Sequence, residues 1–158
     1  RLQVRVAERA DVDLLTRWDI DSDLEMQDHP ADQVDLEGSR AAVEAFVDAG
    51  EQFVLEAGRV PVCTCTWNAR LPESVQIGVY TPPSLRGRGY ARSVVAGALQ
   101  LAAAAGVERS ILFTAVKNRP ARRAYESIGF QRVGDFGILL FAGAHGTAAP
   151  QSRAGMLA

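Results

Sequence analysis

The sequence has few of the side chains that bind metals or form disulfides. Two histidines, His29 and His145, and two cysteines, Cys63 and Cys65, occur among 158 residues. A structural zinc site gathers about four such ligands, so we expect no metal. Two cysteines that close together in one strand share a backbone, which is poor geometry for a mutual disulfide. We therefore expect two buried, free thiols in a reducing compartment, the cytoplasm.

Lysine and long apolar runs are also scarce. Lys117 is the only lysine, and the net charge is −2, so no basic surface of the kind that binds nucleic acid is expected. No run approaches the roughly 18 consecutive apolar residues of a membrane helix. No apolar leader of the secretory type opens the sequence, which agrees with a cytoplasmic location. We expect neither nucleic acid nor membrane among the partners.

What remains is the composition of an ordinary globular domain. Apolar residues make up 47% and charged residues 23%, and the length suits one domain with its own core. We expect a single domain over residues 1–141, working as a monomer or homodimer. Residues 142–158 are small, polar and aperiodic, and we expect a loosely ordered tail there.

Periodicity and turn signals predict a mixed α/β domain with about four helices. Helices are expected from an N-cap at Asp11, up to a stop at Gly50, and over Gly89–Ala105 and Pro120–Ile128. Strands are expected over Leu2–Val6, Gln52–Ala57, Val60–Asn68, Val75–Thr81, Ser110–Val116, Gln131–Val133 and Gly137–Phe141. Two further stretches are expected to be irregular: the acidic run Asp19–Glu37, a loop with room for a short helix, and the loop Ala69–Ser74.

The richest local pattern lies between the strand ending at Thr81 and the helix starting at Gly89. Gly87 and Gly89 allow a close backbone approach to an anion, and the first amides of a helix carry partial positive charge. Arg86, Arg88 and Arg92 add fixed positive charge. A bare pair of glycines more often marks a plain turn with solvated arginines. Here the strand before, the helix after and the arginines favour a pyrophosphate site.

Two common phosphate-binding classes are excluded by the residues present. No Gly-Lys-Ser/Thr triplet occurs, as a nucleotide-hydrolase loop would require. The dinucleotide fingerprint also fails, because Arg92 stands where its third glycine belongs and the strand Ser110–Val116 has no acidic residue.

The stretch Arg86-Gly87-Arg88-Gly89-Tyr90-Ala91 resembles the acetyl-CoA loop of the GNAT N-acetyltransferases, Arg/Gln-x-x-Gly-x-Gly/Ala. The stretch from Asn118 to Phe130 resembles the second signature of that superfamily, an Asn, a short helix with a Tyr, and then Gly-Phe. The two signatures occur in order with a strand between them. The resemblance covers about Phe53–Phe141 and includes a Val-Tyr-Thr-Pro-Pro sequence common in one branch of small bacterial members.

The resemblance implies a GNAT-like fold and acetyl-CoA as cosubstrate. Its central, mostly antiparallel sheet would be splayed between Val75–Thr81 and Ser110–Val116, and the pantetheine arm would lie in the splay. The main chain of Val79 and Thr81 would meet the acetyl and pantetheine groups. The pyrophosphate would meet the loop, formed by Gly87, Arg88, Gly89, Tyr90, Ala91 and Arg92.

The second signature implies two further site residues. Tyr125 would be the general acid that protonates the leaving thiolate, although the same residue could serve only as aromatic packing beside Ile128 and Phe130. Asn118 would contact the cosubstrate, or it could simply cap the following helix. Some family members carry a Glu where this sequence has Val75, so the general base stays unassigned, with Glu73, a water chain or an acid from the first third as options.

The implied function is therefore acetyl transfer from acetyl-CoA to a primary amine, on a small molecule or a peptide, by direct attack in a ternary complex. The alternative is a catalytically weak module that binds or senses acyl-CoA. A longer acyl donor also stays open. The acidic run Asp19–Glu37 has eight carboxylates and no Lys or Arg. Glu25 and Asp28 within it are candidates for binding a cationic acceptor, against the plainer reading of a solvated acidic loop.

Overall fold

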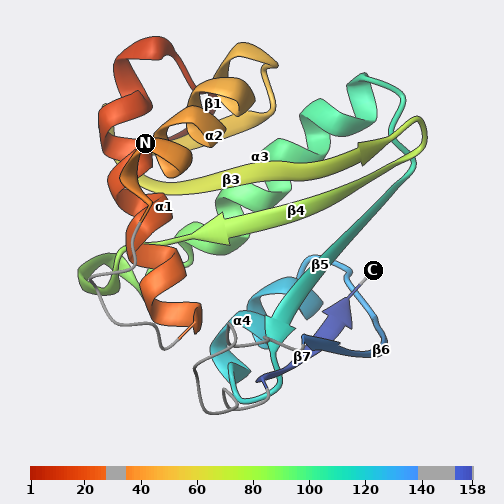
Figure 1. Cartoon of the computed structure of the whole chain (residues 1–158). Helices are drawn as coiled ribbons and strands as arrows, with labels where there is room; N and C mark the ends of the chain where they lie inside the picture. Colours follow the sequence, from red (N-terminus) through yellow and green to blue (C-terminus); the bar gives the residue numbers. More distant parts are fainter. Residues whose placement is uncertain (28–34, 139–151, 158) are drawn as a thin grey trace, which may run out of the picture.

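The computed structural model describes residues 1–27, 35–138 and 152–157. Seven strands form one sheet in the order β1-β2-β3-β4-β5-β7-β6 (Figure 1). All neighbouring strands are antiparallel except β4 and β5, which are parallel. This mixed sheet with four α-helices confirms the predicted fold class.

The element bounds follow the predicted order closely. The strands are β1 (Leu2–Val6), β2 (Gln52–Ala57), β3 (Val60–Leu71), β4 (Ser74–Tyr80), β5 (Arg109–Ala115), β6 (Arg132–Ile138) and β7 (Ser152–Leu157). The helices are α1 (Val12–Gln27), α2 (Leu36–Asp48), α3 (Tyr90–Ala104) and α4 (Arg119–Glu126), with short 3-10 turns η1 (Arg9–Asp11) and η3 (Pro83–Leu85).

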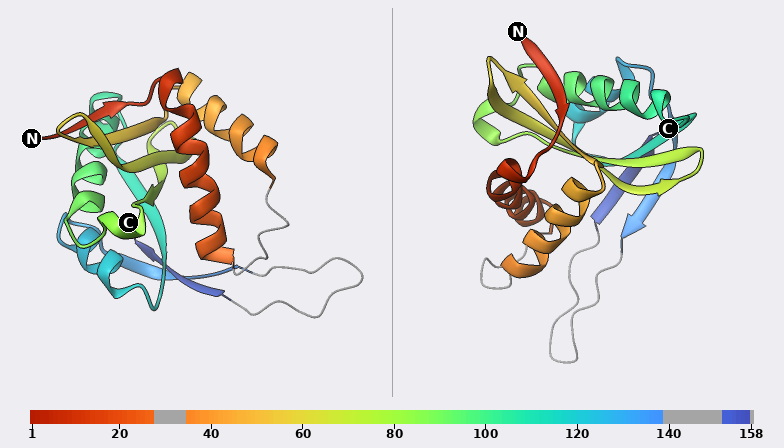
Figure 2. Two further views of the ribbon diagram at one scale, coloured as in Figure 1. Left: turned by 90° about the vertical axis from the view of Figure 1, so that its left-hand side faces the viewer. Right: turned by 90° about the horizontal axis from the view of Figure 1, so that it is seen from above.

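The sheet has a separate core on each face. Helix α3 covers one face and helices α1 and α2 cover the other, as the right-hand view of Figure 2 shows. We call the first the cofactor face, because the predicted acetyl-CoA loop leads into α3. Its core holds Cys63, Cys65 and Ile77 from the sheet, with Val94 of α3 and Tyr125 of α4. We call the second the acceptor face, because Glu25, predicted to bind the acceptor, lies on α1. Alternation along each strand produces both cores, because successive side chains point to opposite faces. The acceptor-face core consists of Ala7, Val12, Leu15, Trp18, Val43, Val47, Val54 and Tyr80.

The prediction of a loop over the acidic run is wrong for its first part. Helix α1 continues unbroken through Asp19 to Gln27. No Gly or Pro interrupts this stretch, and Ile20 and Leu24 are spaced by one helical turn, so its acidic composition did not prevent helix formation. Asp35 then caps α2 by accepting a hydrogen bond from the Gly38 amide at 2.9 Å. Asp28, a predicted acceptor-binding residue, lies outside the described residues.

The helix entry differs from the prediction as well. Asp11 is the last residue of the turn η1, which leads directly into α1 and has Glu8 as its N-cap. The Asp11 carboxylate accepts the Glu8 amide at 2.8 Å in a capping box. Arg5 of β1 donates to the same carboxylate at 2.6 Å. The Arg5 hydrogen bond is the main reason that the pKa of Asp11 is lowered. Asp11 therefore ties the start of α1 to the first strand.

Two other predicted irregular segments are strands. Ala69, Arg70 and Leu71 extend β3 and pair with β4, so only Pro72 and Glu73 form the turn that was expected to span Ala69–Ser74. The predicted loose tail is wrong for Ser152–Leu157, which form β7 and pair with both β5 and β6. The two short strands expected near the end are one strand, β6, as far as the described residues reach.

No helix among the described residues is long and apolar enough to cross a membrane. Both cysteines are free and buried, as expected. These thiols lie on β3, next to the strand that carries the candidate site.

Candidate active site

Strands β4 and β5 pair over only the first part of their length. The last pair joins Ile77 to Leu112. Beyond it, β4 continues along β3 while β5 continues along β7. Figure 1 shows β5 turning away from β4 toward β7 and β6. The predicted splay therefore begins immediately after Ile77 and Leu112, and we call it the splay below.

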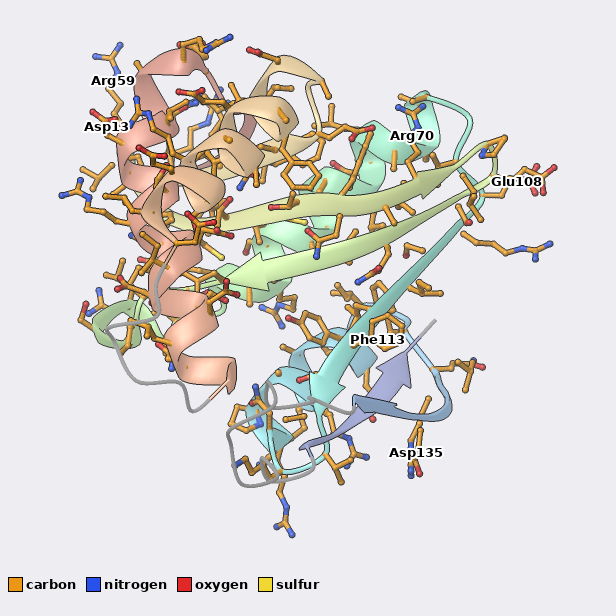
Figure 3. All side chains as sticks on the ribbon, viewed as in Figure 1. Asp13, Arg59, Arg70, Glu108, Phe113 and Asp135 are labelled. Atoms are coloured by element: carbon orange, nitrogen blue, oxygen red, sulfur yellow. The ribbon has the colours of Figure 1, made fainter. Side chains whose placement is uncertain are left out.

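The edge of β4 along the splay is formed by Gly78, Val79 and Tyr80, none of which pairs with β5. A strand edge of this kind offers amide and carbonyl groups to an extended ligand, as an added strand would. Val79 and Thr81, the residues predicted to meet the acetyl and pantetheine groups by their main chain, lie on and directly after this edge. Phe113, labelled in Figure 3, is the first β5 residue past the shared ladder.

The glycine loop enters α3 through two left-handed residues. Gly87 and Gly89 have φ angles of +76° and +79°, which side chains other than glycine rarely adopt. Gly89 is the N-cap of α3 and offers no side chain to satisfy its amides. Within the described residues, the amides from Gly87 to Arg92 donate to no other group of the protein. A Cβ built at Gly87 would meet nothing within 4 Å. The loop and helix start thus offer open amides to an anion.

Two of the three arginines stay at this loop and one leaves it. Arg88 donates to the Ser84 carbonyl at 3.4 Å, and Nη2 of Arg92 lies 3.8 Å from a Cβ built at Gly89. Arg86 instead crosses to the acceptor face. Its Nε donates to the Thr81 carbonyl at 2.8 Å, and its Nη2 pairs with Glu25 at 2.6 Å. Positive charge at the loop therefore comes from its amides, Arg88 and Arg92. Tyr90 and Ala91 open the helix at the same place, both partly buried.

Tyr125 is buried on the cofactor face, with 7% of its surface exposed. Its ring stands edge-on to Phe130, with centroids 6.1 Å apart. Its hydroxyl has no hydrogen-bond partner within the described ranges and is not among the fully enclosed polar atoms. Burial, with smaller effects of Cys65 and Cys63, raises the pKa of Tyr125 above its usual range. The phenol therefore keeps its proton at neutral pH and can act as a donor. Because Cys65 is the cross-strand partner of Val79, the ring lies near the splay.

The thiols of Cys63 and Cys65 lie near the splay and are poor nucleophiles. The Cys63 sulfur lies 3.1 Å from the Thr81 hydroxyl. Burial raises the pKa of Cys63 to about 12, against the lowering effect of that hydrogen bond. Burial raises the pKa of Cys65 as well. Only a thiolate is a good nucleophile, so neither cysteine is suited to carry an acetyl group.

Asn118 caps the helix that follows it, as the simpler of its two interpretations predicted. It is the N-cap of α4, and its side-chain oxygen accepts a hydrogen bond from the Ala121 amide at 3.2 Å. Pro120 in the first turn strengthens the helix start, because a proline costs no hydrogen bond there. Asn118 thus fixes the helix that carries Tyr125, and a ligand contact by its amide nitrogen stays a prediction.

The acceptor face has a compact polar contact that the sequence did not indicate. Besides pairing with Arg86, Glu25 accepts a hydrogen bond from the Tyr80 hydroxyl at 3.4 Å, and the Arg86 guanidinium lies 5.8 Å from the Tyr80 ring centre. Glu25 is near the C-terminal end of α1, where a carboxylate interacts unfavourably with the helix dipole. The positive charge of Arg86 compensates for this interaction. The expectation of uncompensated charge is therefore wrong for Glu25. Alternation along β4 could have placed Tyr80 on this face, but no local signal reveals the partner of Arg86.

Comparison with known proteins agrees with this architecture. The family model described as acetyltransferase (GNAT) domain matches residues 1–131. No curated protein matches the sequence. Among solved structures, yncA from Salmonella typhimurium with its cofactor acetyl-CoA is similar at a TM-score of 0.78 and 18% identity, covering 99% of this chain and 92% of that one.

Two further solved structures share the fold at similar identity. Ribosomal-protein-alanine N-acetyltransferase from Brucella melitensis gives a TM-score of 0.77 at 20% identity, covering 98% of this chain and 97% of that one. Spermidine N-acetyltransferase from Vibrio cholerae, with CoA and spermine, gives 0.73 at 18%, covering 99% and 94%. Because the family model spans well over half of the 158 residues, this protein belongs to the acetyltransferase (GNAT) domain family.

Proposed function

We propose that this protein transfers the acetyl group of acetyl-CoA directly to a primary amine in a ternary complex. One observation carries the proposal: the β4–β5 ladder ends at Ile77, so the rest of β4 has a free edge that leads to the open amides of the glycine loop, and the buried Tyr125 shares the core of Ile77. A ligand with a pyrophosphate at one end and a thioester at the other can occupy the loop and the splay together.

The cosubstrate would be held mainly by backbone groups. The amides of Gly87 to Arg92 would bind the pyrophosphate, with Arg88 and Arg92 adding charge. The main chain of Val79 and Thr81 would hold the pantetheine and acetyl groups along the β4 edge. A Cβ at Gly89 would be strained at its φ of +79°, so the close approach of an anion depends on glycine there.

Acetyl transfer requires one bond to form and one to break. The neutral amine nitrogen attacks the thioester carbonyl and gives up one proton to solvent. The carbon–sulfur bond breaks, and the sulfur leaves as a thiolate. Tyr125 would donate its hydroxyl proton to that sulfur, and solvent would restore the proton. The raised pKa of Tyr125 keeps the proton on the phenol until sulfur charge develops beside it.

Direct transfer is favoured over an acetyl-enzyme intermediate because of the thiols. Cys63 and Cys65 are the only cysteines, and both are buried beside the splay with a raised pKa. Neither supplies the thiolate that a covalent intermediate on sulfur would need. Both substrates would therefore be bound together, as ternary-complex kinetics would show.

We further propose a cationic primary amine as the acceptor, on a small molecule or a peptide, with the bacterial cytoplasm as the setting. The support is the acidic composition of the second half of α1, where Asp19 is partly buried and Asp21 and Asp23 are exposed. Burial, with a smaller effect of the neighbouring Asp23, raises the pKa of Asp19. Ion pairing of Glu25 with Arg86 limits this attraction, so we expect a preference rather than strict selection.

The proposal is tested by following CoA release from acetyl-CoA with a panel of amines, and by weighing the products. We expect one acetylated amine for each CoA released, with diamines ahead of neutral amines of similar size. CoA binding by calorimetry with no product from any amine would instead identify a binding or sensing module.

A further inference from the structure

A bulge in β3 places one carboxamide beside the splay. Trp67 pairs with Ile77 and Ala69 pairs with Gln76, so Asn68 is an extra residue between them with no opposing residue on β4. A bulge of this kind redirects a side chain, and bulges gather next to active sites. Asn68 is exposed, and its side chain makes no hydrogen bond within the described residues. The Asn68 carboxamide can both donate and accept a hydrogen bond. At a regular strand position it would lie against a cross-strand neighbour, whereas in the bulge it has none.

Gly78 shows where this carboxamide lies. A Cβ built at Gly78 would stand 2.6 Å from Nδ2 and 3.1 Å from Oδ1 of Asn68. Gly78 is not among the glycines with positive φ, so its backbone does not require glycine. Glycine in the interior of a strand weakens it and marks a close approach by another group. The group that approaches here is the Asn68 side chain.

This contact is at the edge where both substrates would meet. Gly78 is the first β4 residue past the last β4–β5 pair. Ile77 belongs to the cofactor-face core with Tyr125, so Gly78 points to the opposite face, which it shares with Tyr80. Asn68 therefore lies on the acceptor side of the splay, and Tyr125 lies on the other side.

We propose that Asn68 binds the acceptor amine, its carboxamide oxygen accepting a hydrogen bond from the attacking nitrogen; this assignment rests on the proposed acetyl transfer. A neutral group suits the task. A carboxylate at this position would stabilise the ammonium form, which cannot attack, whereas a carboxamide orients the nitrogen without raising the pKa of the amine. The amine then reaches the carbonyl from one face of the sheet, and the phenol that protonates the departing sulfur lies on the opposite face.

The first test compares acceptor kinetics of wild type, Asn68→Ala and Leu71→Ala. Leu71 is a matched control, since it is exposed on the same strand. We expect Asn68→Ala to lower kcat/KM for the amine about tenfold, the scale of one hydrogen bond, with the KM for acetyl-CoA and the melting temperature unchanged. Leu71→Ala should stay within twofold of wild type. Asn68→Ala within twofold of wild type would overturn the assignment, and loss of acetyl-CoA affinity would do the same.

Two further variants separate contact from structure. Asn68→Asp should move the rising limb of the kcat profile to higher pH by about one unit, because a neighbouring negative charge raises the pKa of the bound amine. Gly78→Ala should displace the carboxamide and reproduce the Asn68→Ala loss, but should add nothing in the Asn68→Ala background. An unshifted profile, or equal Gly78→Ala effects in both backgrounds, would contradict the proposal. A wild type that acetylates no amine would refute the proposed function itself, and this assignment with it.

Discussion

The two faces of the sheet differ in how their polar groups are organised. On the cofactor face the candidate binding groups are backbone amides, two left-handed glycines and one buried phenol, from Val79 to Tyr125. On the acceptor face the polar groups are side chains from distant segments, joined by contacts such as Glu25 with Arg86, 61 residues apart. In the proposed function, backbone groups would bind the part of acetyl-CoA that never varies, whereas side chains, which substitution can change, would fit the other face to a particular amine.

The largest effect is expected from a substitution at Gly89, in the loop on the cofactor face. Gly89→Glu should weaken CoA binding at least about 100-fold, because the residue would be strained at positive φ and its carboxylate would repel the pyrophosphate. Gly106→Glu is the matched control. Gly106 ends the same helix with a φ of +84°, so strain is similar and the pyrophosphate is absent. Calorimetry with CoA measures both variants, and equal affinities would disprove the loop assignment.

Loss of the phenol should affect turnover rather than binding. Tyr125→Phe should lower kcat by about 100-fold, a usual contribution of a positioned general acid, and keep acetyl-CoA affinity. Tyr80→Phe provides the comparison across the sheet, because its hydroxyl makes only a 3.4 Å hydrogen bond to Glu25. That variant should stay within about threefold of wild type. If both tyrosine variants turn over alike, Tyr125 is a packing residue.

The acceptor-face ion pair should tune selectivity by a smaller factor. Arg86→Gln releases the Glu25 carboxylate and should raise the preference for diamines over neutral amines about threefold, whereas Glu25→Gln should lower it. The preference should shrink between 0.1 M and 1 M salt, as the Debye length falls from ~10 Å to ~3 Å. Steady-state kinetics with matched amines measure it. A preference insensitive to salt and to both changes would show that α1 does not select the acceptor.

The pH profile should show the smallest change. A general acid must be protonated, so activity falls as pH rises through its pKa. Because the pKa of Tyr125 is raised, no fall should occur up to about pH 10, the usual value for tyrosine. Activity should only rise as the amine loses its proton. An alkaline fall centred between pH 7 and 9, absent in Tyr125→Phe, would show that burial does not protect this proton.

The sequence predicted the cofactor face well because its signals are local. These signals are the glycines at a helix start, Pro120 in a first turn and the end of a strand after Thr81. Each depends on only a few neighbouring residues, so it can be interpreted without knowing the rest of the fold. The positions of Gly87, Gly89 and Tyr125 followed from these signals together with the family resemblance. Their roles in binding and catalysis stay predictions.

The acceptor face was predicted poorly because its structure depends on distant contacts. The loop predicted over Asp19–Gln27 rested on acidic composition, whereas these residues continue α1 and are held by contacts of Glu25 with Tyr80 and Arg86, which are distant in the sequence. The tail predicted over β7 rested on its small and polar residues, and only pairing with β5 and β6 makes it a strand. The bulge at Asn68 likewise follows from register and has no local signature.

The most direct test of the central claim, that acetyl-CoA binds where β4 and β5 part, is hydrogen exchange with and without CoA. Peptides from Gly78–Thr81 and Gly87–Arg92 should exchange more slowly once CoA fills the splay and the loop, because their amides gain partners. Peptides from α2 on the acceptor face should be unchanged. Protection that spares both segments at saturating CoA, or that falls mainly on α2, would contradict the account.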